Sequence, residues 1–576
     1  MKIMIAQVSP SIGDLRHNQS LIKENINAAL LDNADVVVFP EMVTTGYPPK
    51  DLLYDHYIWI SHEKLVKNIE EFILSTKKQI TVIFGGIREV KEPYGMFSRY
   101  NTAFIIDPIY RTRFVHKKLL PCYDVFDENI YFKPGNENST PIPISYRNKD
   151  NELKTSYCDV IICEDMWNFQ NKGTVPWMSP GSYMRDPVSE LKGDGPIFII
   201  NASPYWENKI SRTTEILKDI SNTLDRLVVW ANQVGGYDDL VFGGYSMFVY
   251  GNKCKRALSF STDKIFIDVQ NFAPSETIDT CPFKNIEPED VENYFLFKAL
   301  GLGLKDYCAR NGFKKIVFGC SGGIDSALVG AIASHYLGGE NVTGITMPSE
   351  FSSEGSWKDS EDLARNFGFK LLNWNIKNIH HEARLTSLQG SDKIEFKNNV
   401  TNENIMPRIR AMLLMSYSND EGALLVSTGN KSEIACGYFT LYGDSCGGYA
   451  LLSDVYKTRV YDLARFINKY LDRKIPSNII NKEPSAELAL NQKDIDSLPP
   501  YSLLDSILKY MIEKNLPKTA IYTIFPNDIS SVQKVENLML KSEHKRSQTP
   551  IGPKVTERAF GSGRDIPISK NLNYVM

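Results

Sequence analysis

The chain has 576 residues, and its 65 lysine and arginine side chains against 69 aspartate and glutamate side chains give a formal net charge of −4. At about 150 residues per domain, this length predicts two to four domains. Hydrophobic residues make up 42% of the chain and aromatic residues 11%, which excludes intrinsic disorder as the main state because disordered chains are poor in both. The near-neutral charge gives no signal for nucleic acid or an anionic membrane surface, so we expect neither as a partner.

The hydropathy pattern predicts neither a membrane span nor a secretory signal. No stretch approaches about 18 consecutive apolar residues, and the N-terminal segment MKIMIAQVSP turns polar at Gln7. A cytoplasmic protein is therefore predicted. The nine cysteines form no CxxC pair and their number is odd, which disfavours a disulfide scaffold. The open question is whether one cysteine is a nucleophile.

Short strands alternating with helices predict an α/β domain at residues 1–270. Apolar runs rich in valine and isoleucine predict strands at 2–8, 35–39, 79–84, 101–107, 159–163, 196–201 and 227–232. Helical periodicity lies between several of them, at 18–31 and 61–75. Because the strands are apolar on both faces, they predict a buried sheet that helices cover.

A second α/β domain is predicted at 289–576. The pattern breaks at 271–288, where three prolines and no periodicity indicate a linker. A helix is then expected at 289–311, a strand at 315–319, a Gly-rich turn, a helix at 325–337 and a second strand at 341–347. This βαβ order predicts an open, parallel, Rossmann-like sheet.

Three residues with reactive side chains lie at the ends of predicted strands or after extended segments of the first domain: Glu41, Lys117 and Cys163. In open α/β sheets, strand ends are where sites form. Together they could make an acyl-transfer site, with a cysteine nucleophile, a glutamate base and a lysine that stabilises the oxyanion. Taken singly, each has an ordinary explanation: a capping glutamate, a solvated lysine and a buried cysteine.

The surrounding sequence resembles the nitrilase superfamily, and within it the glutaminase branch. The matching words are VVFPEM with Glu41, KKLLPCYDVFDENIYF with Lys117, ICEDMW with Cys163 and NASPY at 201–205. The resemblance implies an αββα layered fold and a cysteine that forms a thioester with glutamine and releases ammonia. It also implies that glutamine is contacted by Tyr123, Glu164, Ser203 and Lys209.

The motif SGGIDS at 321–326 lies between a predicted strand and a predicted helix. Two adjacent glycines let the backbone approach a phosphate, and the N–H groups that open the helix favour that anion. Asp325 could hold Mg²⁺, which prefers carboxylate and phosphate oxygens. A plain Gly-rich turn is the alternative. The motif is not a Walker A loop; it is similar to the pyrophosphate loop of enzymes that split ATP into AMP and pyrophosphate.

Further words extend the resemblance to the glutamine-dependent NAD⁺ synthetases and cover nearly the whole chain. They are MPSEFSS at 347–353, ENIMPRIR at 403–410, STGNKSEIACGYFTLYGD at 427–444, KEPSAEL at 482–488 and HKRSQTPIGPK at 544–554. The resemblance implies ATP contacts from Gly319, Cys320, Ser321, Gly322, Gly323, Ile324, Asp325, Ser326, Thr428 and Lys457. It implies deamido-NAD⁺ contacts from Asn404, Glu433 and Lys545, and Mg²⁺ ligands in Asp325 and Glu433.

The resemblance therefore implies an enzyme that hydrolyses glutamine and amidates deamido-NAD⁺ through an adenylate, giving AMP and pyrophosphate. Its second domain is expected to be adenine nucleotide alpha hydrolase-like, and the chain to form a homo-oligomer. Two alternatives stay open. Another pyrophosphate-loop amidotransferase could activate a different acid, or the first domain could be a purely structural module beside a synthetase that uses ammonia.

Overall fold

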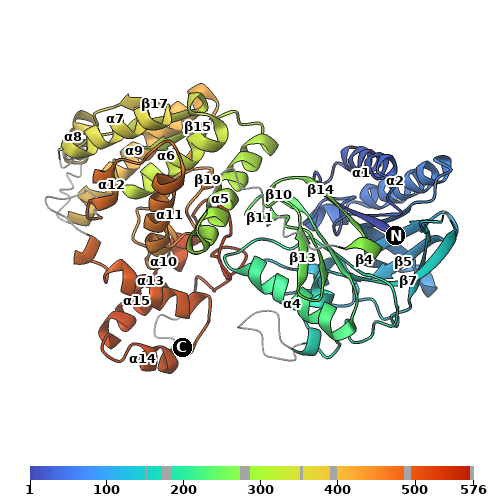
Figure 1. Ribbon diagram of the computed structural model, residues 1–576. Helices are drawn as coiled ribbons and strands as arrows, with labels where there is room; N and C mark the ends of the chain where they lie inside the picture. Colours follow the sequence, from blue (N-terminus) through green and yellow to red (C-terminus); the bar gives the residue numbers. More distant parts are fainter. Residues whose placement is uncertain are drawn as a thin grey trace. The chain divides into compact units, whose positions relative to one another are not determined.

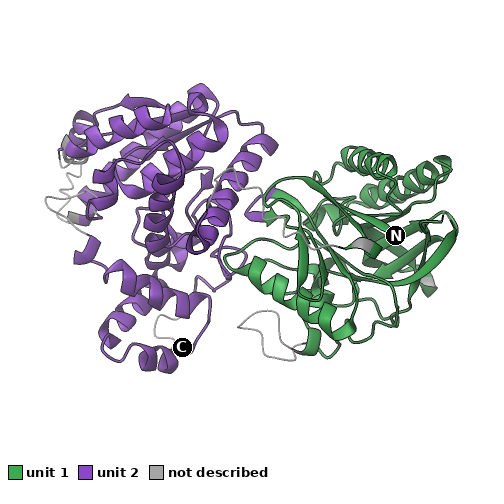
Figure 2. Ribbon diagram, viewed as in Figure 1, with its two compact units in different colours: residues 1–235, 242–282 green, residues 236–241, 283–576 purple. Residues whose placement is uncertain are grey.

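The computed structural model describes residues 1–150, 152–171, 183–272, 286–350, 354–389, 399–484 and 494–570. The chain divides into two compact units (Figure 2). Residues 1–235 and 242–282 form unit 1, and residues 236–241 and 283–576 form unit 2. Most of the expected linker, at 273–285, lies outside the described residues, so the domain limits drawn from the sequence stay predictions.

Unit 1 is built on two six-stranded sheets. The first has the order β14-β1-β2-β3-β4-β5, with β1 (Lys2–Gln7), β2 (Val36–Val38), β3 (Thr81–Lys91), β4 (Phe97–Asp107), β5 (Arg111–His116) and β14 (Asp263–Asp268). The second has the order β13-β12-β9-β8-β7-β6, with β6 (Ile142–Arg147), β7 (Leu153–Ile162), β8 (Ile197–Asn201), β9 (Val228–Asn232), β12 (Met247–Tyr250) and β13 (Lys253–Arg256). A separate pair consists of β10 (Val234–Tyr237) and β11 (Leu240–Gly243). The central strands β1–β3 and β7–β9 are parallel.

The two sheets of unit 1 pack face to face between helices. Side chains from both sheets, such as Ile5 and Ile200, form one buried cluster. Alternate residues of the first sheet, such as Val37, pack against α1 (Leu15–Leu31) and α2 (His56–Ser75). The second sheet contacts α4 (Lys209–Leu224) on its outer side (Figure 1), and a short helix, α3 (Glu128–Tyr131), lies between β5 and β6 in the chain. The αββα fold expected from the resemblance is confirmed.

The predicted strands and helices of unit 1 are present, but their ends shift. α1 and α2 begin earlier than predicted because the carboxylates of Asp14 and Asp55 accept backbone N–H groups and open the helices. Strands β5, β6 and β10–β14 were not predicted. Several lie at sheet edges and mix exposed with buried residues, so they lack the continuous apolar run of the central strands.

Unit 2 is an open parallel sheet in the order β17-β16-β15-β18-β19. Its strands are β15 (Lys315–Gly319), β16 (Val342–Thr346), β17 (Lys370–Asn373), β18 (Ala423–Ser427) and β19 (Tyr449–Ala450). Its longer helices are α5 (Val291–Arg310), α6 (Ile324–Leu337), α7 (Glu354–Phe367), α8 (Lys377–Gln389), α9 (Asn399–Glu421), α11 (Lys457–Tyr470), α13 (Tyr501–Ile512) and α15 (Ile529–Lys541). The shorter ones are α10 (Lys431–Cys436), α12 (Ser477–Asn481), α14 (Lys518–Ile524) and α16 (Glu543–Arg546).

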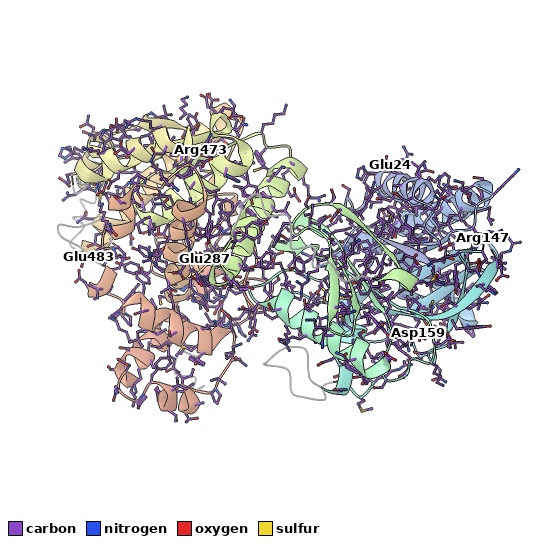
Figure 3. All side chains as sticks on the ribbon, in the orientation of Figure 1. Glu24, Arg147, Asp159, Glu287, Arg473 and Glu483 are labelled. Atoms are coloured by element: carbon purple, nitrogen blue, oxygen red, sulfur yellow. The ribbon has the colours of Figure 1, made fainter. Side chains whose placement is uncertain are left out.

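Helices cover both faces of the unit 2 sheet. Val317 of β15 packs with Ile409 of α9, whereas the next residue, Phe318, lies against Gly330 of α6. Helices α10, α13, α14 and α15 form a separate apolar cluster. At the start of the unit, Glu287 pairs with Lys469 of α11 at 2.7 Å (Glu287 is labelled in Figure 3). The Rossmann-like prediction for this half is confirmed.

The strand order of unit 2 reverses at β15. The chain leaves β15 for β16 on one side and returns to β18 on the other, and ligands of open α/β sheets bind where the order reverses, beyond the carboxyl ends of the strands. The SGGIDS motif follows β15 and Thr428 follows β18, so both lie at this point. Among the helices that the structure describes, none has the length and apolarity that a membrane span requires.

Candidate active sites

The strand ends of unit 1 bring Glu41 and Lys117 together in a fully buried ion pair. The Lys117 Nζ lies 2.9 Å from Glu41 Oε1, and both side chains are 0% exposed. Asn101 Nδ2 donates to the same Glu41 oxygen at 2.6 Å, and the backbone N–H of Ala202 donates to the other at 2.9 Å. These contacts fix the carboxylate from three sides.

Cys163 follows β7 and begins a short 3₁₀ helix, Cys163–Met166. Its backbone has φ +45°, a left-handed conformation that is strained for a non-glycine residue and is concentrated at functional sites. The carboxylate of Asp165, two residues on, accepts the N–H of Ile162 at 3.1 Å and that of Lys118 at 3.0 Å. Asp165 therefore ties the cysteine turn to the segment that carries Lys117.

The charges of this site act on one another. Burial raises the pKa of the Cys163 thiol well above its ordinary value, Glu41 raises it further, and Lys117 opposes both. Burial alone would lower the pKa of Lys117, but Glu128 and Glu41 hold it well above its ordinary value. The resting site thus holds a neutral thiol and a charged ammonium, so the cysteine needs a base before it can attack.

The predicted glutamine contacts fall into two pairs. The Tyr123 hydroxyl lies 3.0 Å from both carboxylate oxygens of Glu164, whose pKa burial raises to about 7. Ser203 and Lys209 line a small cavity together with other residues, among them Trp230 and Asn232. Lys209 also lies 5.5 Å from the ring of Trp167, which directly follows the cysteine helix.

In unit 2 the SGGIDS loop is held in shape by its own hydroxyls. Ser321 Oγ and Ser326 Oγ lie 3.1 Å apart, Gly323 N–H donates to Ser321 Oγ at 3.2 Å, and Ser326 Oγ donates to the Gly323 carbonyl at 3.0 Å. Gly322 has φ +76°, and a Cβ there would collide with the carbonyl oxygen of Ser356. The loop therefore needs glycine at this position.

Cys320 sits differently from the other loop residues. Its N–H continues the strand pairing by donating to the Ile345 carbonyl at 2.9 Å, and its side chain is buried. Burial raises the pKa of its thiol to about 11. It is a packing residue, and any contact it makes with ATP would come from its backbone.

Lys457 joins two predicted ligand-binding carboxylates. Its Nζ lies 2.5 Å from Asp325 Oδ2 and 3.2 Å from Glu433 Oε1, and its side chain is 4% exposed. Asn430 Nδ2 donates to Asp325 Oδ1 at 2.9 Å, and Asn430 also caps α10, the helix that carries Glu433. Burial raises the pKa of Glu433 to about 7, while Lys457 lowers it. The structure therefore groups Glu433 with the predicted ATP residues.

Asn404 and Lys545 converge on the loop after α10. Lys545 Nζ donates to the carbonyls of Gly437 and Phe439, each at 2.8 Å, and Asn404 Oδ1 accepts the hydroxyl of Thr440 at 2.7 Å. Thr440 N–H donates in turn to Asp444 at 2.8 Å. Two predicted deamido-NAD⁺ contacts, which are 141 positions apart in sequence, thus meet at one loop.

Comparison with known proteins finds a matching family for each half of the chain. The carbon-nitrogen hydrolase family model matches residues 2–172, and the NAD synthase family model matches residues 296–549. The glutamine-dependent NAD(+) synthetase of Aquifex aeolicus is 36% identical over an alignment of 602 residues that covers 99% of this chain and 100% of the relative. The chain belongs to the glutamine-dependent NAD⁺ synthetase family.

Solved structures of the family extend the match to the fold. The glutamine-dependent NAD⁺ synthetase of Acinetobacter baumannii, in complex with ADP, is 32% identical, covers 98% of each chain and gives a TM-score of 0.70. The Cytophaga hutchinsonii synthetase gives 0.79 at 20% identity, covering 99% of this chain and 98% of that one, which shows the shared fold. The prediction of an ATP-dependent, glutamine-hydrolysing NAD⁺ synthase is confirmed. Because relatives of this family match nearly the whole chain, the alternative of a different amidotransferase is set aside.

Sequence reasoning missed several residues of the synthetase sites. Glu128 Oε1 lies 2.6 Å from Lys117 Nζ and accepts the hydroxyl of Tyr47 at 2.9 Å. Glu128 stands within the same word as Lys117, eleven positions on, but no pattern separated it from the other acids there. In unit 2, Asp494 accepts the Tyr501 hydroxyl at 2.8 Å, and its charge acts on Glu433.

Proposed function

We propose that Cys163 is the nucleophile of the glutaminase reaction. It attacks the carboxamide carbon of glutamine, a thioester forms, the amide nitrogen leaves as ammonia, and water then releases glutamate. The observation that carries this proposal is the buried Glu41–Lys117 pair beside a cysteine with strained backbone at the end of β7. Such a site has a base, a cation and a nucleophile within one water-excluded space.

Glu41 would take the thiol proton and later pass it to the leaving nitrogen. Its Oε2 accepts only the Ala202 N–H among the described contacts, so this oxygen can receive a proton while Oε1 still accepts the hydrogen bond from Lys117. Lys117, charged in the resting enzyme, would stabilise the oxyanion of the tetrahedral intermediate. Glu128 holds Lys117 in place from the other side.

Tyr123, Glu164, Ser203 and Lys209 are proposed to hold glutamine. Glu164 would face the α-ammonium of the substrate, since it is buried directly after the nucleophile. The other buried carboxylate of this turn, Asp165, already accepts backbone N–H groups. Substrate binding would then keep Glu164 ionised, because a nearby cation lowers the pKa that burial raises to about 7. Ser203 and Lys209 line a small cavity, and we expect a polar group of the substrate to enter there.

In unit 2 we place the ATP phosphates on the SGGIDS loop, from Gly319 to Ser326, with Thr428 and Lys457 beside them. The nicotinate carboxylate of deamido-NAD⁺ would attack the α-phosphorus, pyrophosphate would leave, and ammonia would displace AMP from the adenylate. Adenylation is needed because a carboxylate is a poor electrophile. Asn404 and Lys545, gathered at the loop after α10, are proposed to contact deamido-NAD⁺.

The residues present fit Mg²⁺. The ion usually takes one or two protein carboxylates and completes its shell with substrate phosphates and water. Asp325 and Glu433 supply two carboxylates that a single lysine bridges. Among the described residues, no group of three or more histidine, cysteine, aspartate and glutamate side chains is arranged to hold a metal ion. When bound, Mg²⁺ would neutralise charge on the phosphates.

The homo-oligomeric state and the cytoplasmic location stay predictions from the sequence. The alternative that unit 1 is only structural is tested by Cys163→Ala. This variant should lose at least 99% of NAD⁺ formation from glutamine and keep the rate with ammonium chloride, measured by coupled reduction of NAD⁺ with alcohol dehydrogenase. Cys254→Ala, which removes a buried cysteine of β13, is the matched control. If Cys163→Ala keeps glutamine-driven synthesis, the nucleophile is another residue.

A further inference from the structure

A cluster of cations surrounds one carboxylate on α16, outside the two candidate sites. Glu543 Oε2 lies 2.8 Å from Arg546 Nη2, 3.4 Å from Arg564 Nη1 and 3.8 Å from Lys570 Nζ. All four side chains are largely buried, with exposed fractions of 11% for Glu543 and Lys570, 8% for Arg564 and 2% for Arg546. We call these four residues the Glu543 cluster.

Arg546 is fully engaged in the fold. Its Nη1 donates to the Ala435 carbonyl at 2.6 Å and its Nη2 to the Met539 carbonyl at 2.5 Å, so it fastens α16 to α10 and α15. Its charge is matched by Glu543, three residues before it. The single negative charge of the cluster is therefore already neutralised before the other two cations are counted.

Arg564 and Lys570 add two positive charges that nothing described in the cluster balances. Arg564 lies on the ring of Phe560, 5.8 Å from its centroid, and Arg546 lies on the same ring at 5.1 Å. The Lys570 Nζ is buried and has no hydrogen-bond partner among the described residues. Its one ion-pair partner is Glu543, 3.8 Å away, and that carboxylate is already paired with Arg546. Burying such an ammonium beside two guanidinium groups is costly unless a further anion joins them.

We propose that Arg564 and Lys570, with Glu543 and Arg546 behind them, form a binding site for a doubly charged oxyanion of the phosphate class. Two unbalanced positive charges match the two negative charges of hydrogen phosphate. A guanidinium presents paired N–H donors that fit two oxygens of a tetrahedral anion, and the ammonium adds a point charge. A single carboxylate would leave one of the two cations without a partner.

The Glu543 cluster lies next to α10, the helix that carries Glu433. Arg546 holds α16 against Ala435 of α10, and Lys545, the neighbouring residue, reaches the loop that follows α10. The proposed anion would thus bind behind the segment that carries Glu433. The inference does not depend on the roles proposed for Glu433 or Lys545, because it concerns binding alone.

Isothermal titration of the full-length protein with sodium phosphate, at constant ionic strength set by sodium chloride, tests the proposal. The protein should bind one phosphate that saturating ATP does not displace. Lys570→Gln and Arg564→Gln should each weaken binding about tenfold, as expected for the loss of one charge-assisted hydrogen bond. Lys541→Gln, which removes an exposed lysine at the end of α15, should leave binding unchanged.

Thermal unfolding supplies a second readout, because phosphate should reverse which of the wild type and the Lys570→Gln variant has the higher melting temperature. In phosphate-free buffer the Lys570→Gln variant should melt at or above the wild-type temperature, because an unbalanced buried cation has been removed. With phosphate the wild type should melt higher. Separate titrations with sulfate and pyrophosphate show which free oxyanion binds most tightly, and AMP, like ATP, should not displace phosphate.

Three results would overturn the proposal. These are no phosphate binding, binding that ATP abolishes, and binding that neither substitution weakens. A fourth would also overturn it: substitutions that change the oligomeric state by size-exclusion chromatography while phosphate binding is absent. That result would assign the cations to a contact between subunits.

Discussion

The role of Glu128 offers the sharpest test of the glutaminase geometry. Glu128→Gln keeps the size of the side chain but removes its charge. Lys117 would lose an ion pair of 2.6 Å and keep only the one with Glu41 at 2.9 Å. The ammonium would then be drawn toward Glu41, which would make that carboxylate a weaker base and move the cation away from the oxyanion position.

The size of the effect follows from the strength of the lost contact. A hydrogen bond to a charged group contributes about 1.5–3 kcal/mol, and each 1.4 kcal/mol is a factor of ten. Glutamine-dependent kcat/KM should therefore fall about 10- to 150-fold. NAD⁺ formation from ammonium chloride should change less than twofold, because the unit 2 residues are untouched.

The assay follows NAD⁺ with glutamine and with ammonium chloride in parallel, and glutamate release alone gives the glutaminase rate. Glu152→Gln is the matched control, since it breaks an exposed ion pair, in which Glu152 Oε2 lies 2.9 Å from Lys154 Nζ. A melting temperature close to the wild type shows that the variant is folded. If folded Glu128→Gln hydrolyses glutamine within threefold of the wild-type rate, the reasoning about Lys117 is wrong.

Three further outcomes are expected. Gly322→Ala should abolish NAD⁺ formation from either nitrogen source while glutamine hydrolysis persists, whereas Gly323→Ala, with no backbone clash, should be milder in the same assay. Burial raises the pKa of Glu164 to about 7, so the folded state holds this proton more tightly than the unfolded state. The free energy of unfolding should therefore fall by about 3 kcal/mol from this group as pH rises from about 4.5 to 7. In urea unfolding, Glu164→Gln should show a smaller change of this free energy with pH. Lys431→Met should lose about 3–5 kcal/mol of unfolding free energy, since it leaves buried carboxylates unpaired, and an unchanged urea midpoint would contradict this.

The central elements could be predicted because their signal is local. The strand at 315–319 was placed without error, and the helix after it began one residue from the predicted position. Continuous apolar runs and a Gly-rich turn are properties of adjacent residues. The pairing of edge strands such as β14, which joins β1 from more than 250 positions away, depends on contacts that no local pattern records.

The site residues divide in the same way. Those within distinctive words were predicted, and the structure brings Glu41 and Lys117 together and joins Asp325, Glu433 and Lys457. The residues that hold them were not predicted. Lys431 bonds Thr556 across 125 positions, and a lone lysine in a sequence gives no sign that it is 0% exposed in the fold.

The net charges of the two sites explain why the unit 2 site needs a divalent cation and the unit 1 site does not. In unit 1, two carboxylates and one ammonium leave a net charge of about −1 around a neutral thiol, taking Glu41, Glu128 and Lys117 as ionised. Moving the thiol proton to Glu41 turns one anion into another and leaves that total unchanged. Because the net charge stays constant, burying the site adds little to the cost of this proton transfer, which depends on how far the negative charge moves.

The unit 2 site carries a larger excess of negative charge. Asp325, Glu433 and Asp494 face a single ammonium, Lys457, so full ionisation would give about −2 before the polyanion ATP arrives. Burial and like charge already raise the pKa of Glu433 to about 7. Binding phosphates there requires added positive charge, which a divalent cation supplies and the glutaminase residues do not need. We therefore expect EDTA to stop NAD⁺ formation from either nitrogen source and to leave glutamine hydrolysis intact; loss of both activities would contradict this charge argument.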